Sequence, residues 1–197
     1  MNLSLLAWAA VTLLLITNIG LLIGRDWRWN LGLLAGQYLA MFMLLAQYWP
    51  LGLAAVKLVT GWMSAATLGI TRLGLNEEAD SAENAWPQGR LFRLFASFVV
   101  IVLALAVAPV FEQMIPGIGR AVVLGGLSLF GIGLLLLGTA SALLRVTIGL
   151  LTLMAGFELL YSTVEASILL TGLLALVNLG LALTGSYLMN AAKESGE

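Results

Sequence analysis

The sequence contains no cysteine and no histidine among its 197 residues. The absence of cysteine excludes disulfides, iron–sulfur clusters and thiolate zinc sites. The absence of histidine excludes the common axial ligand of haem and the side chain that titrates near neutral pH. We therefore expect no metal, no cofactor and no catalytic residue in this chain. Any proton chemistry has to use Glu, Lys, Tyr and water.

Charged residues are also scarce. They make up 10% of the chain, against about 25% in a typical soluble domain, and 61% of the residues are hydrophobic. A chain of this composition cannot cover a water-facing surface, so we expect the lipid bilayer to be its solvent. The net charge of −1 and the lack of a basic patch argue against a nucleic-acid partner.

Long apolar stretches predict an all-α, multi-pass membrane protein, because a membrane-spanning helix needs about 20 mostly apolar residues. Ala121 to Val164 is apolar throughout, but as one helix it would be about 65 Å long, twice the thickness of a bilayer core. The chain must therefore reverse within it, between Gly138 and Arg145. This gives seven predicted transmembrane helices: Leu3–Ile23, Leu31–Trp49, Leu51–Ile70, Leu94–Phe111, Ala121–Ser141, Val146–Val164 and Ile168–Asn190.

The positions of the cations predict the orientation. With seven spans, one side of the membrane receives Arg25, Arg28, Arg72, Arg90, Arg93, Arg145 and Lys193. The other side receives Arg120 alone. By the positive-inside rule the N-terminus is outside and the C-terminus is cytoplasmic, and we expect the protein in a bacterial or archaeal inner (plasma) membrane.

The one sizeable polar segment runs from Arg72 to Arg93 and is rich in Glu and Asp. It is either a solvated cytoplasmic linker or a docking loop for a cytoplasmic partner. It contains no phosphate-binding or dinucleotide-binding motif.

Two ionisable residues fall inside predicted spans, where a charge is costly and marks a functional candidate. Lys57 lies about 10 Å from the outer face, counted from Pro50, and Glu158 lies at a similar depth, counted from Arg145. An ion pair between them is consistent with this depth but not required. Glu158 is then a structural partner of Lys57, a titratable proton site on a hydrated path, or a boundary residue at a thinned bilayer.

Uncharged polar residues in the spans have a plainer interpretation. Asn178, near the middle of the last span, cannot titrate and is expected to bond another helix or a water. We interpret Asn18, Gln37 and Gln47 in the same way, as inter-helix hydrogen-bonding groups, and Tyr38 as an interfacial residue. Glycine pairs such as Gly125-Gly126 suit close helix packing in lipid, as do the other spaced glycines, Gly131, Gly133, Gly172, Gly180 and Gly185.

The last three predicted helices resemble a known family. The middle one reads Arg145-Val-Thr-Ile-Gly-Leu-Leu-Thr-Leu-Met-Ala-Gly-Phe-Glu158-Leu-Leu-Tyr-Ser, and the third contains Leu-Val-Asn178-Leu-Gly. This is similar to the NuoK subunit of respiratory complex I and to its relative MrpC of multisubunit cation/proton antiporters. In length and layout the whole chain resembles component E of formate-hydrogenlyase-type membrane hydrogenases. That component has an extra helical half before a NuoK-like end and a lysine in an early span, as Lys57 is here.

The resemblance implies a role within a larger complex. Members of the family are not enzymes alone; they sit beside antiporter-like and other membrane subunits, where embedded carboxylates carry protons or couple their movement to electron transfer. Glu158 matches the glutamate of the family's middle helix. The family's second glutamate, on the last helix, falls at Asn178, so one of two titratable groups is replaced.

These observations predict two regions and leave more than one function open. Residues 1–118 would form a four-helix membrane region with the cytoplasmic loop 72–93, and residues 119–197 the NuoK-like three-helix region with a short cytoplasmic tail. The leading hypothesis is a non-catalytic subunit of a complex I-related complex in which Glu158, Lys57 and Asn178 serve proton transfer or coupling. The alternatives are a structural scaffold between larger subunits and a small autonomous transporter.

Overall fold

The computed structural model describes residues 3–75, 89–115, 117–164 and 167–194. Within these ranges the chain is helical, with seven helices and only turns and short extended connections between them. The helices are α1 (Leu3–Ile23), α2 (Trp27–Leu45), α3 (Leu51–Leu73), α4 (Arg90–Met114), α5 (Arg120–Thr139), α6 (Leu143–Tyr161) and α7 (Ile168–Glu194). Six of them, all except α2, are long and apolar enough to cross a membrane. The prediction of an all-helical membrane protein is confirmed at this level.

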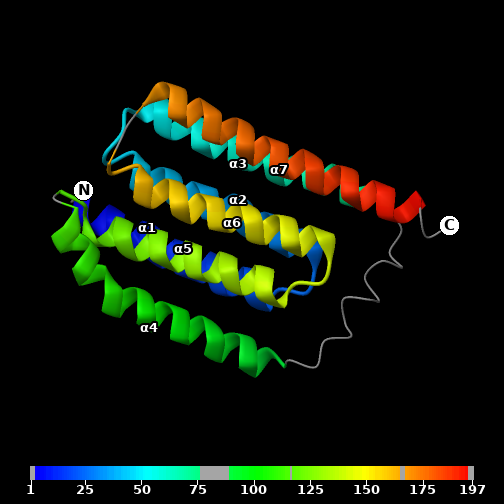
Figure 1. Ribbon diagram of the computed structural model, residues 1–197, viewed down its shortest axis with the longest axis horizontal. Coiled ribbons are helices and arrows are strands. Elements are labelled where there is room, and N and C mark those ends of the chain that lie inside the picture. The colour runs from blue at the N-terminus through cyan, green and yellow to red at the C-terminus, as the bar shows by residue number, and fades with distance from the viewer. Residues whose placement is uncertain (1–2, 76–88, 116, 165–166, 195–197) are drawn as a thin grey trace.

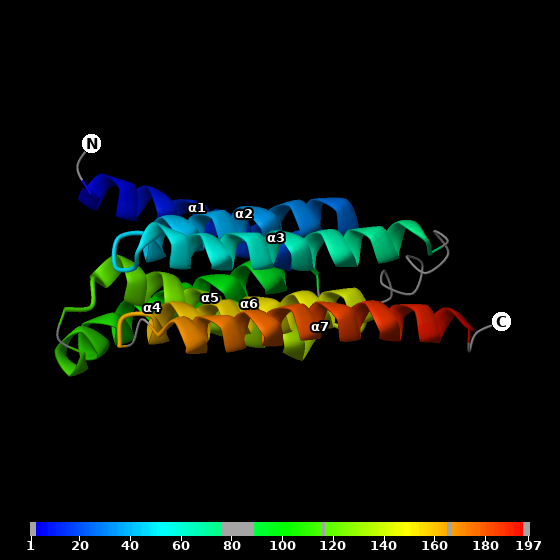
Figure 2. The same cartoon turned by 90° about the horizontal axis from the view of Figure 1, so that it is seen from above.

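The helices form two layers (Figures 1 and 2). One layer contains α1, α2 and α3 side by side, and the other contains α5, α6 and α7. The layers stack in the same order, so that α1 packs on α5, α2 on α6 and α3 on α7. α4 lies outside this arrangement, against α5 and α1. Most of the core therefore lies between two equivalent triplets of helices.

Contacts near the helix termini show which termini share an end of the bundle. At one end, called end A, Trp49 after α2 donates its indole N–H to the carbonyl of Ser162 after α6, over 2.8 Å. At the opposite end, called end B, Arg145 at the start of α6 donates to the carbonyl of Gly24 after α1. Arg93 in the first turn of α4 reaches the carbonyl of Leu22, also at end B. Successive helices thus run in alternating directions.

Short sequence features begin and end these helices. Asp26 caps α2, because its carboxylate accepts the backbone N–H of Arg28 over 2.9 Å. Pro50 precedes α3 with its fixed φ of −54°, and a proline suits a helix start because it lacks the N–H that would be unsatisfied there. Gly119 and Ala142 adopt extended backbone immediately before α5 and α6. The predicted reversal between Gly138 and Arg145 is confirmed at residues 140–142.

The tightest packing in the molecule joins α5 and α6 and depends on glycine. A methyl group at Gly156 would meet the backbone of Phe130 at 2.5 Å, and one at Gly133 would meet the backbone of Leu153 at 2.6 Å. Such approaches are possible only without a side chain, as expected for helices packed in lipid. The prediction for the glycines holds for Gly126, Gly131, Gly133 and Gly185, whose added methyl groups would each meet a neighbouring helix, but not for Gly172 and Gly180, which have open space around them.

Several predicted boundaries were wrong by a turn. α2 begins at Trp27 and not at Leu31, because the Asp26 cap lets the polar residues before Leu31 join the helix, and it ends at Leu45 and not at Trp49. α3 and α4 extend into the predicted polar loop 72–93, whose central part, 76–88, lies outside the described residues. Lys193, predicted in a tail, lies in the last turn of α7.

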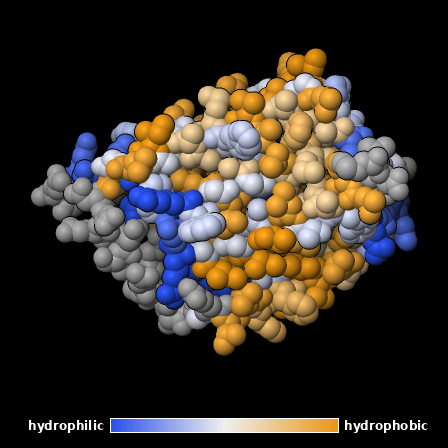
Figure 3. Space-filling model, turned by 180° about the vertical axis from the view of Figure 1, so that it is seen from behind, coloured by the Kyte–Doolittle hydropathy of each residue, from blue (hydrophilic) through white to orange (hydrophobic). Residues whose placement is uncertain are grey.

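The surface of the bundle has the pattern of a membrane protein. Apolar side chains fill the middle of the face shown in Figure 3, and hydrophilic residues gather towards its two ends. α4 and α7 contribute much of the exposed apolar surface, with Phe95, Leu103 and Leu176 among the most exposed large residues. Lipid is the solvent that such a surface requires.

Candidate functional site

The candidate site lies where α3, α6 and α7 meet, in the half of the bundle nearer to end A. The structure brings Lys57, Glu158 and Asn178 into direct contact, one from each helix. All three are buried, with 1%, 2% and 0% of their surface exposed. Sequence reasoning placed Lys57 and Glu158 at a common depth and left their pairing open; in the structure they form a salt bridge.

The ion pair has a defined geometry. The Lys57 ammonium lies 2.8 Å from Oε1 of Glu158. Asn178 donates from Nδ2 to the same oxygen over 3.0 Å, and Lys57 also lies 3.4 Å from the carbonyl of Thr171. Two donors on one oxygen, one of them charged, compensate the burial of the carboxylate, which would otherwise cost several kcal/mol.

The second carboxylate oxygen of Glu158 is different. Oε2 is buried and has no hydrogen-bond partner in the described part of the chain, and Oδ1 of Asn178 is in the same condition. Buried polar atoms are normally satisfied by a protein group or a water. These two oxygens are therefore the places where the site can accept a proton or bind water.

The local sequence explains why these side chains point inward. On α3, Lys57, Gly61 and Ser64 are spaced by four and three residues and share one face. On α7, Thr171 and Asn178 are seven residues apart and share the face that packs on α3. All five are buried. Two polar faces are thus opposed, and Glu158 enters from α6 between them.

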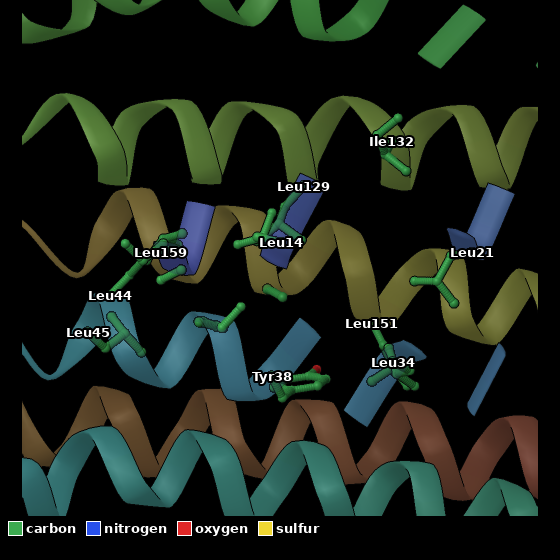
Figure 4. Close-up of a cluster of buried hydrophobic side chains, with 14 of the residues drawn as sticks. Leu14, Leu21, Leu34, Tyr38, Leu44, Leu45, Leu129, Ile132, Leu151 and Leu159 are labelled. Atoms are coloured by element: carbon green, nitrogen blue, oxygen red, sulfur yellow. The ribbon is translucent and has the colours of Figure 1, made fainter. Parts of the chain in front are cut away.

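Tyr38 corrects the prediction of an interfacial tyrosine. Its side chain is completely buried, on the face of α2 directed towards α3 and α7 (Figure 4). Its ring lies against Gly61, where a methyl group would overlap the ring atoms. The phenol is within electrostatic reach of Glu158, and its oxygen has no hydrogen-bond partner in the described residues. Sequence reasoning missed this residue because an isolated Tyr in an apolar helix does not show which face it occupies.

The amides predicted to bond between helices gave mixed results. Gln37 on α2 fulfils the expectation, because Thr152 on α6 donates to its Oε1 over 3.4 Å. Gln47 does not; it donates to the carbonyl of Met43 within its own segment. Asn18 is fully buried, but neither atom of its amide has a partner in the described residues.

Comparison with known proteins adds no assignment. No protein-family model, no curated protein and no solved structure matches the chain. The functional argument therefore rests on the geometry of Lys57, Glu158 and Asn178 and on the resemblance stated above.

Proposed function

We propose that the chain crosses the membrane seven times, with its N-terminus outside and its C-terminus in the cytoplasm of a bacterial or archaeal cell. The alternating helix directions support this, because they require α2 to cross together with the six more apolar helices. The cations support the orientation. They lie at helix termini of end B, namely Arg25, Arg28, Arg72, Arg90, Arg93, Arg145 and Lys193, whereas Arg120 starts α5 at end A. End B is then cytoplasmic.

Within that membrane the chain is a non-catalytic, NuoK-like subunit of a complex I-related ion-translocating complex, and its closest counterpart is component E of a membrane hydrogenase. Antiporter-like and other membrane subunits are its partners. Redox centres belong to those partners, consistent with a sequence without Cys or His. The observation that carries the proposal is the buried contact of Lys57, Glu158 and Asn178, since Glu158 is the residue that the resemblance selects.

The arrangement is suited to coupling a charge to a movement. With Lys57 at 2.8 Å, the ionised form of Glu158 is stabilised by a cation and by the Asn178 amide. If a neighbouring subunit draws Lys57 away, the carboxylate loses its counter-charge in a low-dielectric core and takes up a proton. Return of Lys57 expels that proton. A displacement of α3 relative to α6 is thereby converted into proton uptake and release.

One observation favours a second function, a structural scaffold. The family's second glutamate is replaced by Asn178, and the Asn178 amide holds Glu158 in place without being able to titrate. In this case the ion pair would fix the packing of α3, α6 and α7, and proton movement would take place in other subunits.

The test is Glu158→Gln in the assembled complex, with ion pumping and electron transfer measured on the same membranes. We expect normal assembly, continued electron transfer and loss of most of the associated pumping. The matched control is Glu112→Gln, the same change on α4 at end A, away from the site. Full coupling in correctly assembled Glu158→Gln complexes would refute the role. Loss of assembly or thermal stability with unchanged coupling per assembled complex would establish the scaffold.

A further inference from the structure

Buried polar atoms that lack a protein partner are distributed unevenly in the bundle. Besides Glu158 and Asn178, such atoms belong to Tyr38 on α2, Ser64 on α3 and Ser186 on α7. Each of these three residues is at most 7% exposed. The ion pair lies closer to end A, yet all three residues lie on the end-B side of it.

Positions along the helices establish this direction. α3 and α7 both run from end A to end B. Ser64 is seven residues beyond Lys57, about 10 Å further towards end B, and Ser186 is eight residues beyond Asn178, about 12 Å further. Seven-residue and eight-residue steps return to the same helix face, so each serine lies on the buried face that carries its partner in the site.

The other two helices at the site show the same bias. α6 runs from end B to end A, so Thr152, six residues before Glu158, lies about 9 Å towards end B. Thr152 donates to Gln37, whose Nε2 has no partner in the described residues, and Tyr38 follows Gln37 on α2. Tyr38, Gln37, Ser64, Thr152 and Ser186 are called the polar stripe below.

Between the ion pair and end A the core is apolar. Ala54 precedes Lys57 on the same face of α3 and is fully buried. Leu44, Leu45 and Leu159 are at most 1% exposed, and Figure 4 shows them together on the α2 and α6 segments beyond Tyr38. Trp49 closes this end through its hydrogen bond to Ser162. No polar atom in this part of the described chain is both buried and without a partner.

We propose that water reaches Glu158 along the polar stripe from end B, and that the apolar layer at end A seals the site on its nearer side. The physical basis is that buried polar atoms of this kind bind water, whereas cavities lined by Leu and Ala stay dry. The inference deepens the proposed function, since it states from which side Glu158 exchanges its proton. It concerns water access, and it stands or falls independently of whether that proton is pumped.

The absence of cysteine makes a direct test available, because each single-cysteine variant carries one thiol in this chain. Ser64→Cys and Ser186→Cys are placed individually in the intact complex. Silver ion, a hydrated monovalent cation that reacts with thiols, is added to one side of sealed right-side-out or inverted membrane vesicles. Unreacted thiol is then titrated with a fluorescent maleimide on the isolated, affinity-tagged chain, so cysteines of partner subunits do not interfere.

Three control variants define the comparison. Ala54→Cys is on the same face of α3 but on the end-A side of Lys57. Asn190→Cys at end B and Gln113→Cys at end A are exposed positions that report which side the reagent has reached.

We expect Ser64→Cys and Ser186→Cys to react from end B at least tenfold faster than Ala54→Cys, and neither to react from end A while Gln113→Cys does. Reaction from end A would overturn the proposal, as would protection of both serine positions at the level of Ala54→Cys. Because serine and cysteine are nearly isosteric and the two positions are on different helices, loss of one variant through misfolding leaves the other as the test. Normal pumping by Glu158→Gln would refute the proposed function without altering these reactivities.

Discussion

The ion pair between Lys57 and Glu158 allows the energetics of the core to be tested without knowing the partners of the chain. At 2.8 Å, Coulomb's law with an effective dielectric constant of about 20 gives about 6 kcal/mol of attraction. Desolvation of the two charges offsets much of this gain, so the net value of the pair is small. Removing one partner is different, because the remaining charge is left buried and uncompensated, at a cost of about 3–5 kcal/mol.

The perturbation is a double-mutant cycle of Lys57→Met, Glu158→Gln and the double variant. We expect each single change to lower the free energy of unfolding by about 3–5 kcal/mol. The double variant should lose less than either single variant, because it leaves no unpaired charge. Its remaining loss, about 1–3 kcal/mol, reflects the altered acceptor for Asn178 and the unused carbonyl of Thr171.

The assay is unfolding of the purified chain in mixed micelles by titration with sodium dodecyl sulfate, followed by circular dichroism. Glu112→Gln serves as the control for loss of a carboxylate outside the site and should change the stability by less than about 0.5 kcal/mol. Additive losses in the double variant, within about 0.5 kcal/mol, would show that the two charges do not interact and would refute the reasoning.

Two further predictions concern packing around the site. Gly156→Ala should destabilise the chain by about 1–3 kcal/mol, because the new methyl group meets the backbone of Phe130, whereas the control Gly172→Ala meets open space and should be neutral or gain up to about 1 kcal/mol in the same unfolding assay. Tyr38→Phe should change the stability by less than about 1 kcal/mol, because the phenol oxygen has no protein hydrogen bond and the ring against Gly61 is kept; a loss above 2 kcal/mol would show that this hydroxyl is held by strong bonds.

The sequence predicted the helices well, because a span needs only length and an apolar composition. α1 was placed at its observed bounds, and the break between α5 and α6 followed from the excessive length of a single helix. Boundaries set by local capping were less accessible. The Asp26 cap moved the start of α2 by a turn, since a polar segment before an apolar run resembles a loop until its capping bond is known.

The site was predictable in part, because depth along a helix can be counted and orientation around it cannot. Counting residues put Lys57 and Glu158 at one level, and the structure joins them. In a helix that is apolar on every side, periodicity does not show which face packs inward, so Tyr38 was assigned to an interface. The pairing of α3 with α7 across the two layers was equally hidden, and this pairing brings Asn178 to the carboxylate.

The topology explains why this chain needs a seventh, peripheral helix. α1–α3 and α5–α7 stack in the same order and with the same directions, so α5 has to start at end A as α1 does. Because α3 finishes at end B, one extra crossing, α4, must return the chain. The ion pair then links the two triplets, with Lys57 on the first and Glu158 and Asn178 on the second. The boundary at 118/119 therefore divides the chain into regions that are distinct in sequence, while the candidate site exists only where the two are packed together.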